Sequence, residues 1–140
     1  MLRETYMNDS VLADFERSMG DEGSFWHDYN LDVASEILDQ FSADTWSVLN
    51  GSVFVHPQYW QERCAESIGY RDNENGIEVL ITLLQSPQIL VAAIAASELD
   101  NMSVRLPKSF SNRLSEILDE LMKQKSSRCE DIKNLICRLE

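Results

Sequence analysis

The residue types that most often carry catalysis or bind metals are sparse in this sequence. His27 and His56 are 29 positions apart, and neither has another histidine or a cysteine at metal-ligand spacing. Phosphate-binding loops and the GxGxxG, GxSxG, HExxH and EF-hand motifs are absent. Glu62 and Glu66 flank Cys64 by two positions on either side, and such carboxylates disfavour a reactive thiolate. We therefore expect no enzymatic activity, no cofactor and no bound metal.

The cysteines and the apolar segments indicate where the chain resides. Cys64, Cys129 and Cys137 are an odd number without a CxxC pair, which is typical of reduced thiols in the cytoplasm. Cys64 and Cys137 lie on apolar helical faces, where we expect them to be buried. The start of the chain has no secretory apolar region. Residues 79–97 are uncharged, but a polar break with a proline at 85–88 favours two buried helices joined by a turn over a membrane span.

Acidity is the most distinctive property of the composition. The chain contains 12 Lys and Arg residues and 24 Asp and Glu residues, which give a net charge of −12 and a pI near 4.5. Residues 1–60 carry a net charge of −9, residues 61–100 carry −5 and residues 101–140 carry +2. Such a chain repels phosphate backbones, so we expect no direct nucleic-acid binding and a basic protein as partner.

Within the acidic half, carboxylates and aromatic residues lie close together. If a helix begins near Asn30, the acids at 28, 32, 36 and 39 fall on one face, at steps of four, four and three. One interpretation is a solvated helix face, and Phe25 or Trp26 would then attach the loop to the core. The other is a docking surface for a basic partner, in which aromatic residues are anchors and acids speed association. The candidate partner-binding residues are Asp21, Glu22, Trp26, Asp28, Tyr29, Asp32, Glu36 and Asp39.

Apolar residues recur at three- and four-residue steps along most of the chain, which predicts an all-α protein with a single domain over residues 1–140. Residues 45–55 fit either a short helix broken at Asn50-Gly51 or an extended segment. The most continuous apolar stretch should be buried on all sides and includes Ile89, Leu90, Ala93, Ile94 and Ala96. The first predicted helix begins after residues 8–10 and ends at Gly20, and the second begins at Asn30. The other predicted helices cover 58–68 (ending at Gly69), 77–85, 89–99, 108–125 and about 132–139.

A weak internal repeat relates the middle helices. Trp60, Ala65 and Ile68 correspond to Val91, Ala96 and Leu99 at an offset of 31 residues. Residues 60–69 resemble the second helix of a HEAT-type repeat, in which an arginine, a small residue and an aliphatic residue before glycine stand at similar places. This resemblance implies that residues 57–140 form stacked helical hairpins, a short HEAT-like α-solenoid behind the acidic helices and loop of residues 1–56. An irregular helical bundle is the alternative.

A small, acidic, all-helical chain without catalytic motifs resembles the immunity proteins of bacterial polymorphic-toxin and contact-dependent inhibition systems, and the Trp60-x-x-Arg63 step is similar to one such family. The resemblance implies a cytoplasmic protein that neutralises a cognate basic toxin domain, for example a nuclease, by binding it. A HEAT-like adaptor or regulatory subunit is the alternative function. A helical nucleic-acid glycosylase would need a basic groove, and the first 100 residues lack the bases to line one.

Overall fold

The computed structural model describes residues 2–140, with side chains from Ser10 onward, and this part of the chain forms α-helices and short 3-10 turns without strands. The all-α prediction is confirmed. The α-helices are α1 (Leu2–Ser18), α2 (Asp28–Leu38), α3 (Ala43–Ser52), α4 (Gln58–Tyr70), α5 (Ile77–Leu83), α6 (Ile89–Asn101), α7 (Ser111–Lys123) and α8 (Cys129–Cys137). The 3-10 turns are η1 (Val53–Val55), η2 (Glu74–Gly76) and η3 (Lys108–Phe110).

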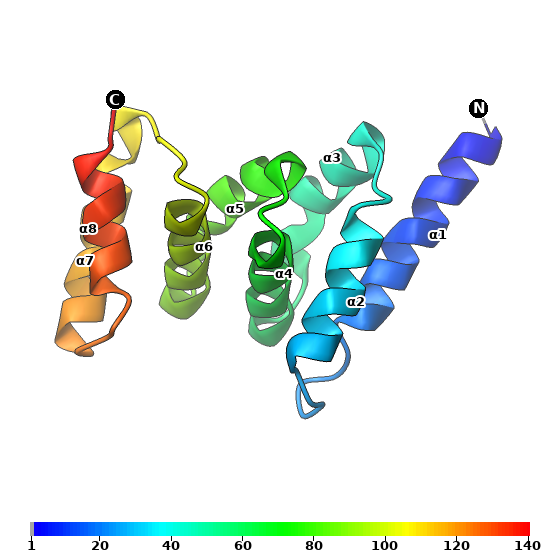
Figure 1. The fold of residues 1–140 in the computed structure, drawn as a ribbon, viewed down its shortest axis with the longest axis horizontal. Coiled ribbons are helices and arrows are strands. Elements are labelled where there is room, and N and C mark those ends of the chain that lie inside the picture. The colour runs from blue at the N-terminus through cyan, green and yellow to red at the C-terminus, as the bar shows by residue number, and fades with distance from the viewer. Residues whose placement is uncertain (1) are drawn as a thin grey trace.

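The helices pack in two rows. The even-numbered helices contact one another in succession, α2 on α4, α4 on α6 and α6 on α8, and lie toward the viewer in Figure 1. Behind them, α3 packs between α1 and α5, and α7 closes the far end against α8 and α6. The described helices thus form a compact bundle around a shared apolar core.

The core is centred on α6, which is apolar around its whole circumference and buried from Val91 to Ser97. This confirms the predicted burial of Ala93, Ile94 and Ala96. Ile89 is only partly buried, and the prediction for Leu90 is wrong because its side chain is 41% exposed. Leu90 lies in the first turn of the helix, where neighbouring helices cover one side only. The uncharged stretch 79–97 forms the end of α5, a turn and the start of α6, and no helix among residues 2–140 is long and apolar enough to span a membrane.

Several predicted boundaries are wrong. Helix α1 begins at Leu2, before residues 8–10, and α2 begins at Asp28 rather than near Asn30. Asn30 still contributes to the start of α2, because its Oδ1 accepts the backbone N–H of the capping residue His27 at 3.0 Å. Helix α3 continues through Asn50-Gly51 because Trp46, Leu49 and Val53 form a continuous buried face.

Helix α7 follows the 3-10 turn η3 and ends at Lys123, whereas the predicted helix covers 108–125. Helix α8 begins at Cys129 and ends at Cys137, whereas the predicted helix covers about 132–139. Cys64 is buried as expected, whereas the prediction for Cys137 is wrong, because this residue is exposed. Burial raises the pKa of the Cys64 thiol, which keeps it protonated and unreactive.

The glycine at 69 does not end α4, which continues to Tyr70. A Cβ atom at this position would lie 1.6 Å from Oε2 of Glu98, so glycine permits the close approach of α4 and α6. The helix ends instead through Asp72 at φ 50°, with the N–H of Asn73 bonded to the carbonyl of Ile68 at 3.1 Å. Helix α6 ends in the same way 31 residues later, through Ser103 at φ 57° and a 3.0 Å bond from Val104 to Leu99.

Candidate protein-binding surface

An arginine of α4 fixes the loop between α1 and α2. Arg63 is buried, and its guanidinium donates to the carbonyl oxygens of Met19 (2.6 Å), Asp21 (3.1 Å) and Ser24 (3.0 Å) and to the Ser24 hydroxyl (3.0 Å). The Met19 carbonyl belongs to the C-terminal end of α1, where carbonyls lack partners within the helix. One planar side chain therefore closes the helix end and sets the course of the loop after it.

Two aromatic rings enclose this guanidinium. The Cζ atom of Arg63 lies 5.2 Å from the centre of the Trp26 ring and 5.0 Å from that of Tyr59, within the range of cation–π attraction. The Tyr59 hydroxyl donates to the carbonyl of Gly20 at 3.0 Å. Gly20 itself has φ +68°, and a Cβ there would lie 2.5 Å from Oγ of Ser24, so the turn requires glycine. The loop is thus held from several sides.

The loop presents large aromatic side chains to solvent. Phe25 is 82% exposed and Tyr29 is 77% exposed, whereas Trp26 is partly buried. Beside them lies a cavity of about 320 Å³ between the end of α1, the loop and the start of α2, with Trp26, Tyr29 and Val33 among its lining residues. Exposed aromatic residues around a concave surface are a common feature of protein-binding sites.

The predicted acidic residues form two groups. Asp21, Glu22 and Asp28 are exposed around the aromatic loop. Farther along α2, Asp32, Glu36 and Asp39 converge on a single cation, Arg71 at the end of α4. Arg71 bonds Asp32 closely and lies 3.6 Å from a carboxylate oxygen of each of the other two.

This arrangement leaves an excess of negative charge along α2. The hydrogen bond to Asp32 is the main cause that raises the pKa of Arg71 above its ordinary value. One guanidinium balances one of the three carboxylates, so the group retains a net negative charge. We call the aromatic loop (residues 21–29) together with this acidic edge of α2 the aromatic–acidic surface. It contains every predicted partner-binding residue.

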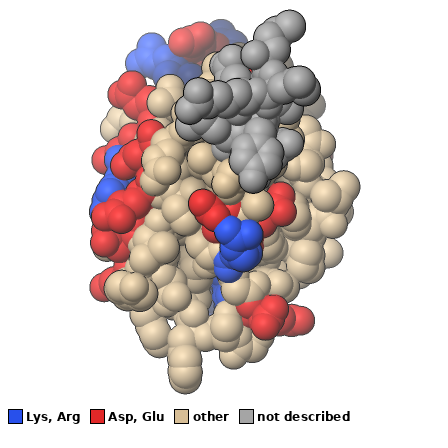
Figure 2. Space-filling view, turned by 90° about the vertical axis from the view of Figure 1, so that its right-hand side faces the viewer, with Lys and Arg blue, Asp and Glu red and all other residues tan. Residues whose placement is uncertain are grey.

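Acidic side chains continue onto the neighbouring even-numbered helices. Glu98 of α6 interacts electrostatically with Glu66 of α4 and Asp131 of α8, and Arg128 opposes these repulsions. Burial, followed by the charge of Glu66, raises the pKa of Glu98 to about 7. Seen from the α1 end, carboxylates gather along the edge that faces the viewer of Figure 1, while the opposite edge carries few charges (Figure 2).

The sequence did not reveal what holds this surface together. Arg63 and Arg71 contact residues 32 to 44 positions away, and no local pattern marks such pairs. The sequence places Phe25 in a loop but does not show that its side chain is exposed. The exposure follows from the fixed course of the loop. Among residues 10–140, whose side chains the structure describes, no group of three or more His, Cys, Asp and Glu side chains is arranged to hold a metal ion.

Comparison of the chain with protein-family models, curated proteins and solved structures finds no match.

Proposed function

We propose that the protein is an immunity protein that binds a basic toxin domain through the aromatic–acidic surface and thereby neutralises it. The observation that carries the proposal is a pair of exposed aromatic side chains, Phe25 on the loop that Arg63 holds in one conformation and Tyr29 in the first turn of α2 after it. Exposed aromatic rings on a fixed loop bury large areas on binding and lose little conformational entropy. The carboxylates beside them favour a partner of positive charge.

The proposal includes a HEAT-like stacking of the helix pairs, with the even-numbered helices lining the acidic side. Three features support it. The even-numbered helices pack in succession, and α3 packs between α1 and α5. The residues matched at an offset of 31 are all buried in α4 and α6, and these two helices end with the same backbone geometry. A stack of this kind presents one continuous surface to a partner.

Growth protection tests the function directly. Where a large secreted protein with a basic C-terminal domain is encoded beside this chain, that domain is the probe, expressed with and without the chain in a susceptible bacterium. We expect the chain to restore growth and to form a stable complex with the purified domain. The alternative function, a HEAT-like adaptor, predicts no protection from such a domain. Absence of both protection and binding would overturn the proposal.

The aromatic anchors and the acids should differ in their kinetic effects. Replacing both Phe25 and Tyr29 by alanine should mainly speed dissociation and cost about 2 kcal/mol or more of binding free energy. Val55→Ala is the matched control, because Val55 is an equally exposed apolar residue in η1, outside the aromatic–acidic surface. Trp26→Ala should also speed dissociation, but Trp26 packs on Arg63, so this variant perturbs the loop as well.

Neutralising the acidic edge of α2 should instead slow association and weaken its dependence on salt. Asparagine and glutamine at positions 32, 36 and 39 preserve side-chain shape, whereas lysine would add three cations around Arg71. Surface-binding kinetics at low and physiological salt separate the two effects. Association rates that are equal for the wild type and the neutral variant, without salt dependence, would mean that these acids form only a solvated face.

A further inference from the structure

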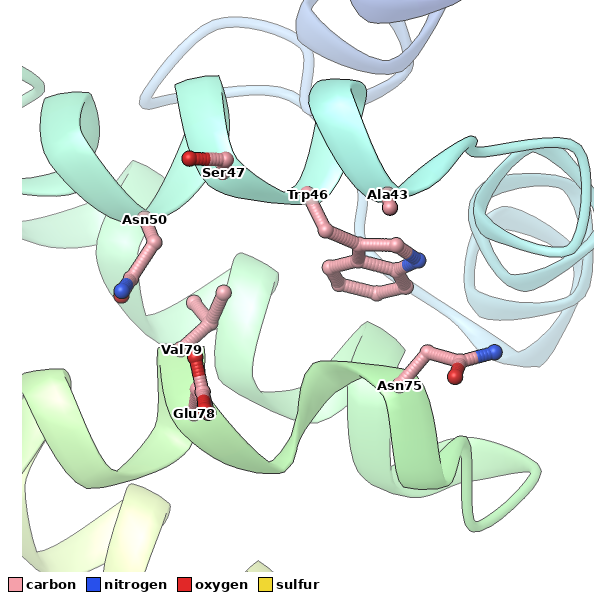
Figure 3. A pocket seen from close by; sticks show the side chains of 7 residues that line it. All are labelled: Ala43, Trp46, Ser47, Asn50, Asn75, Glu78 and Val79. Atoms are coloured by element: carbon pink, nitrogen blue, oxygen red, sulfur yellow. The ribbon is translucent and has the colours of Figure 1, made fainter.

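A second cavity lies in the other row of helices, between α3 and α5, and the proposed function does not use it. It encloses about 260 Å³ and is lined by side chains from α3, η2 and the start of α5. Trp46 and Asn50 point from α3 toward α5, and Val79 points back toward them from α5 (Figure 3). A volume below the range of drug-sized pockets suits a single side chain.

The walls of this cavity are held in place by the core. Trp46 is 8% exposed, its ring packs edge-on against Phe41 with 5.0 Å between centroids, and a Cβ on Gly76 would lie 3.0 Å from its Cη2 atom. On the other wall, Oδ1 of Asn50 accepts the Thr82 hydroxyl at 2.6 Å. The indole and the carboxamide are therefore fixed before any ligand arrives.

The polar groups of the cavity favour a planar cation. Glu78 is exposed at its rim and forms no ion pair with another residue of the described chain, and the lining contains no lysine or arginine. The side-chain carbonyl oxygens of Asn50 and Asn75 add acceptors. A guanidinium pairs with a carboxylate through two parallel hydrogen bonds and stacks on aromatic rings, which an ammonium does less well.

We propose that the cavity between α3 and α5 binds the side chain of an arginine from a basic protein partner. The guanidinium pairs with Glu78, and the aliphatic part of the side chain contacts Trp46 and Val79. This site is independent of the aromatic–acidic surface and of the toxin-neutralising function. It gives the protein a second point of contact with a basic protein.

Titration with small molecules tests the site without knowledge of the partner. The probe is N-acetyl-arginine methylamide, and the control is the citrulline derivative, which has the same shape and no charge. The readout is the indole N–H signals of the three tryptophans in ¹H–¹⁵N spectra, assigned with Trp→Phe variants. We expect saturable shifts centred on Trp46, with the arginine derivative binding about fivefold or more tightly than the citrulline derivative.

The matched variants are Glu78→Gln and Glu74→Gln. Each variant removes one exposed carboxylate, and the two positions lie in adjoining turns, but only Glu78 lines this cavity. Glu78→Gln should abolish the preference for arginine over citrulline, and Glu74→Gln should keep it. Equal binding of the two probes to the wild-type protein would overturn the proposal, and so would shifts confined to other tryptophans or equal effects of the two variants. The wild-type comparison decides the question alone if a variant fails to fold.

Discussion

Replacing Arg63 by methionine should destabilise the whole protein and release the loop that carries Phe25. Methionine keeps most of the aliphatic stem but removes every hydrogen bond of the guanidinium. The carbonyl of Met19 is buried, so it loses its partner without gaining water, whereas the carbonyls of Asp21 and Ser24 lie in an exposed loop and can rehydrate. The loss of a charged hydrogen bond to a buried group costs about 2–3 kcal/mol, and the rehydrated groups add about 1 kcal/mol together.

The expected decrease in the free energy of unfolding is therefore about 3–4 kcal/mol, measured by urea denaturation followed by circular dichroism. Arg63→Lys keeps the charge and one donor for Met19, so about half of that loss is expected. Arg105→Met is the matched control, because Arg105 is exposed and no hydrogen bond or ion pair involves it in residues 2–140. Hydrogen exchange at residues 19–25 should become faster in the Arg63 variants only. A decrease below about 1 kcal/mol with unchanged exchange would refute the role assigned to Arg63.

Four further substitutions test the packing and the electrostatics. Ile94→Asp should prevent stable folding because the position is 3% exposed in the core. Leu90→Asp should leave a cooperative thermal transition, because position 90 is 41% exposed. Gly76→Ala should cost about 1–3 kcal/mol in urea denaturation, because the new Cβ would lie 2.5 Å from Cγ2 of Ile68. The raised pKa of Glu98 means that the folded state holds a proton more tightly than the unfolded state, so stability should fall as the pH rises from about 4.5 to about 7. Glu98→Gln should flatten this fall and stabilise the protein at pH 8 by on the order of 1 kcal/mol, a figure reduced for the solvent exposure of the carboxyl, and an unchanged pH profile would contradict the assignment.

The helices could be predicted from the sequence because their apolar residues repeat at the helical period, but their ends could not. A helix end depends on contacts that the local sequence does not show. Gly51 and Gly69 are typical helix breakers. Gly51 nevertheless lies within α3, which has a continuous buried face, and Gly69 lies at the end of α4, where Glu98 approaches closely. The sequence predicts that a helix begins at Asn30, but Asn30 lies inside the first turn of α2 and accepts the N–H of His27.

The acidic side of the candidate surface could be predicted for the same reason, since steps of three and four place carboxylates on one helix face. The cation among them could not, because Arg71 follows Asp32 by 39 residues and meets it only through the packing of α4 on α2. The cavity between α3 and α5 was missed because Trp46 and Glu78 are 32 residues apart. Their common location depends on the way α3 and α5 lie against each other.

The placement of the arginines explains why the acids dominate the surface. Arg63 binds carbonyls at the end of α1, Arg113 donates to the carbonyls of Leu84 (2.5 Å) and Ser86 (2.7 Å) after α5, and Arg138 pairs with Asp100 near the end of α6 at 2.9 Å. The guanidinium groups of Arg63 and Arg113 thus oppose the partial negative charge of a helix C-terminus, and that of Arg138 is paired with a carboxylate. Cations used in this way contribute less to the field outside the protein than exposed lysines would. The carboxylates of the even-numbered helices keep most of their field, and a basic partner should therefore associate faster at low salt than the net charge alone would suggest.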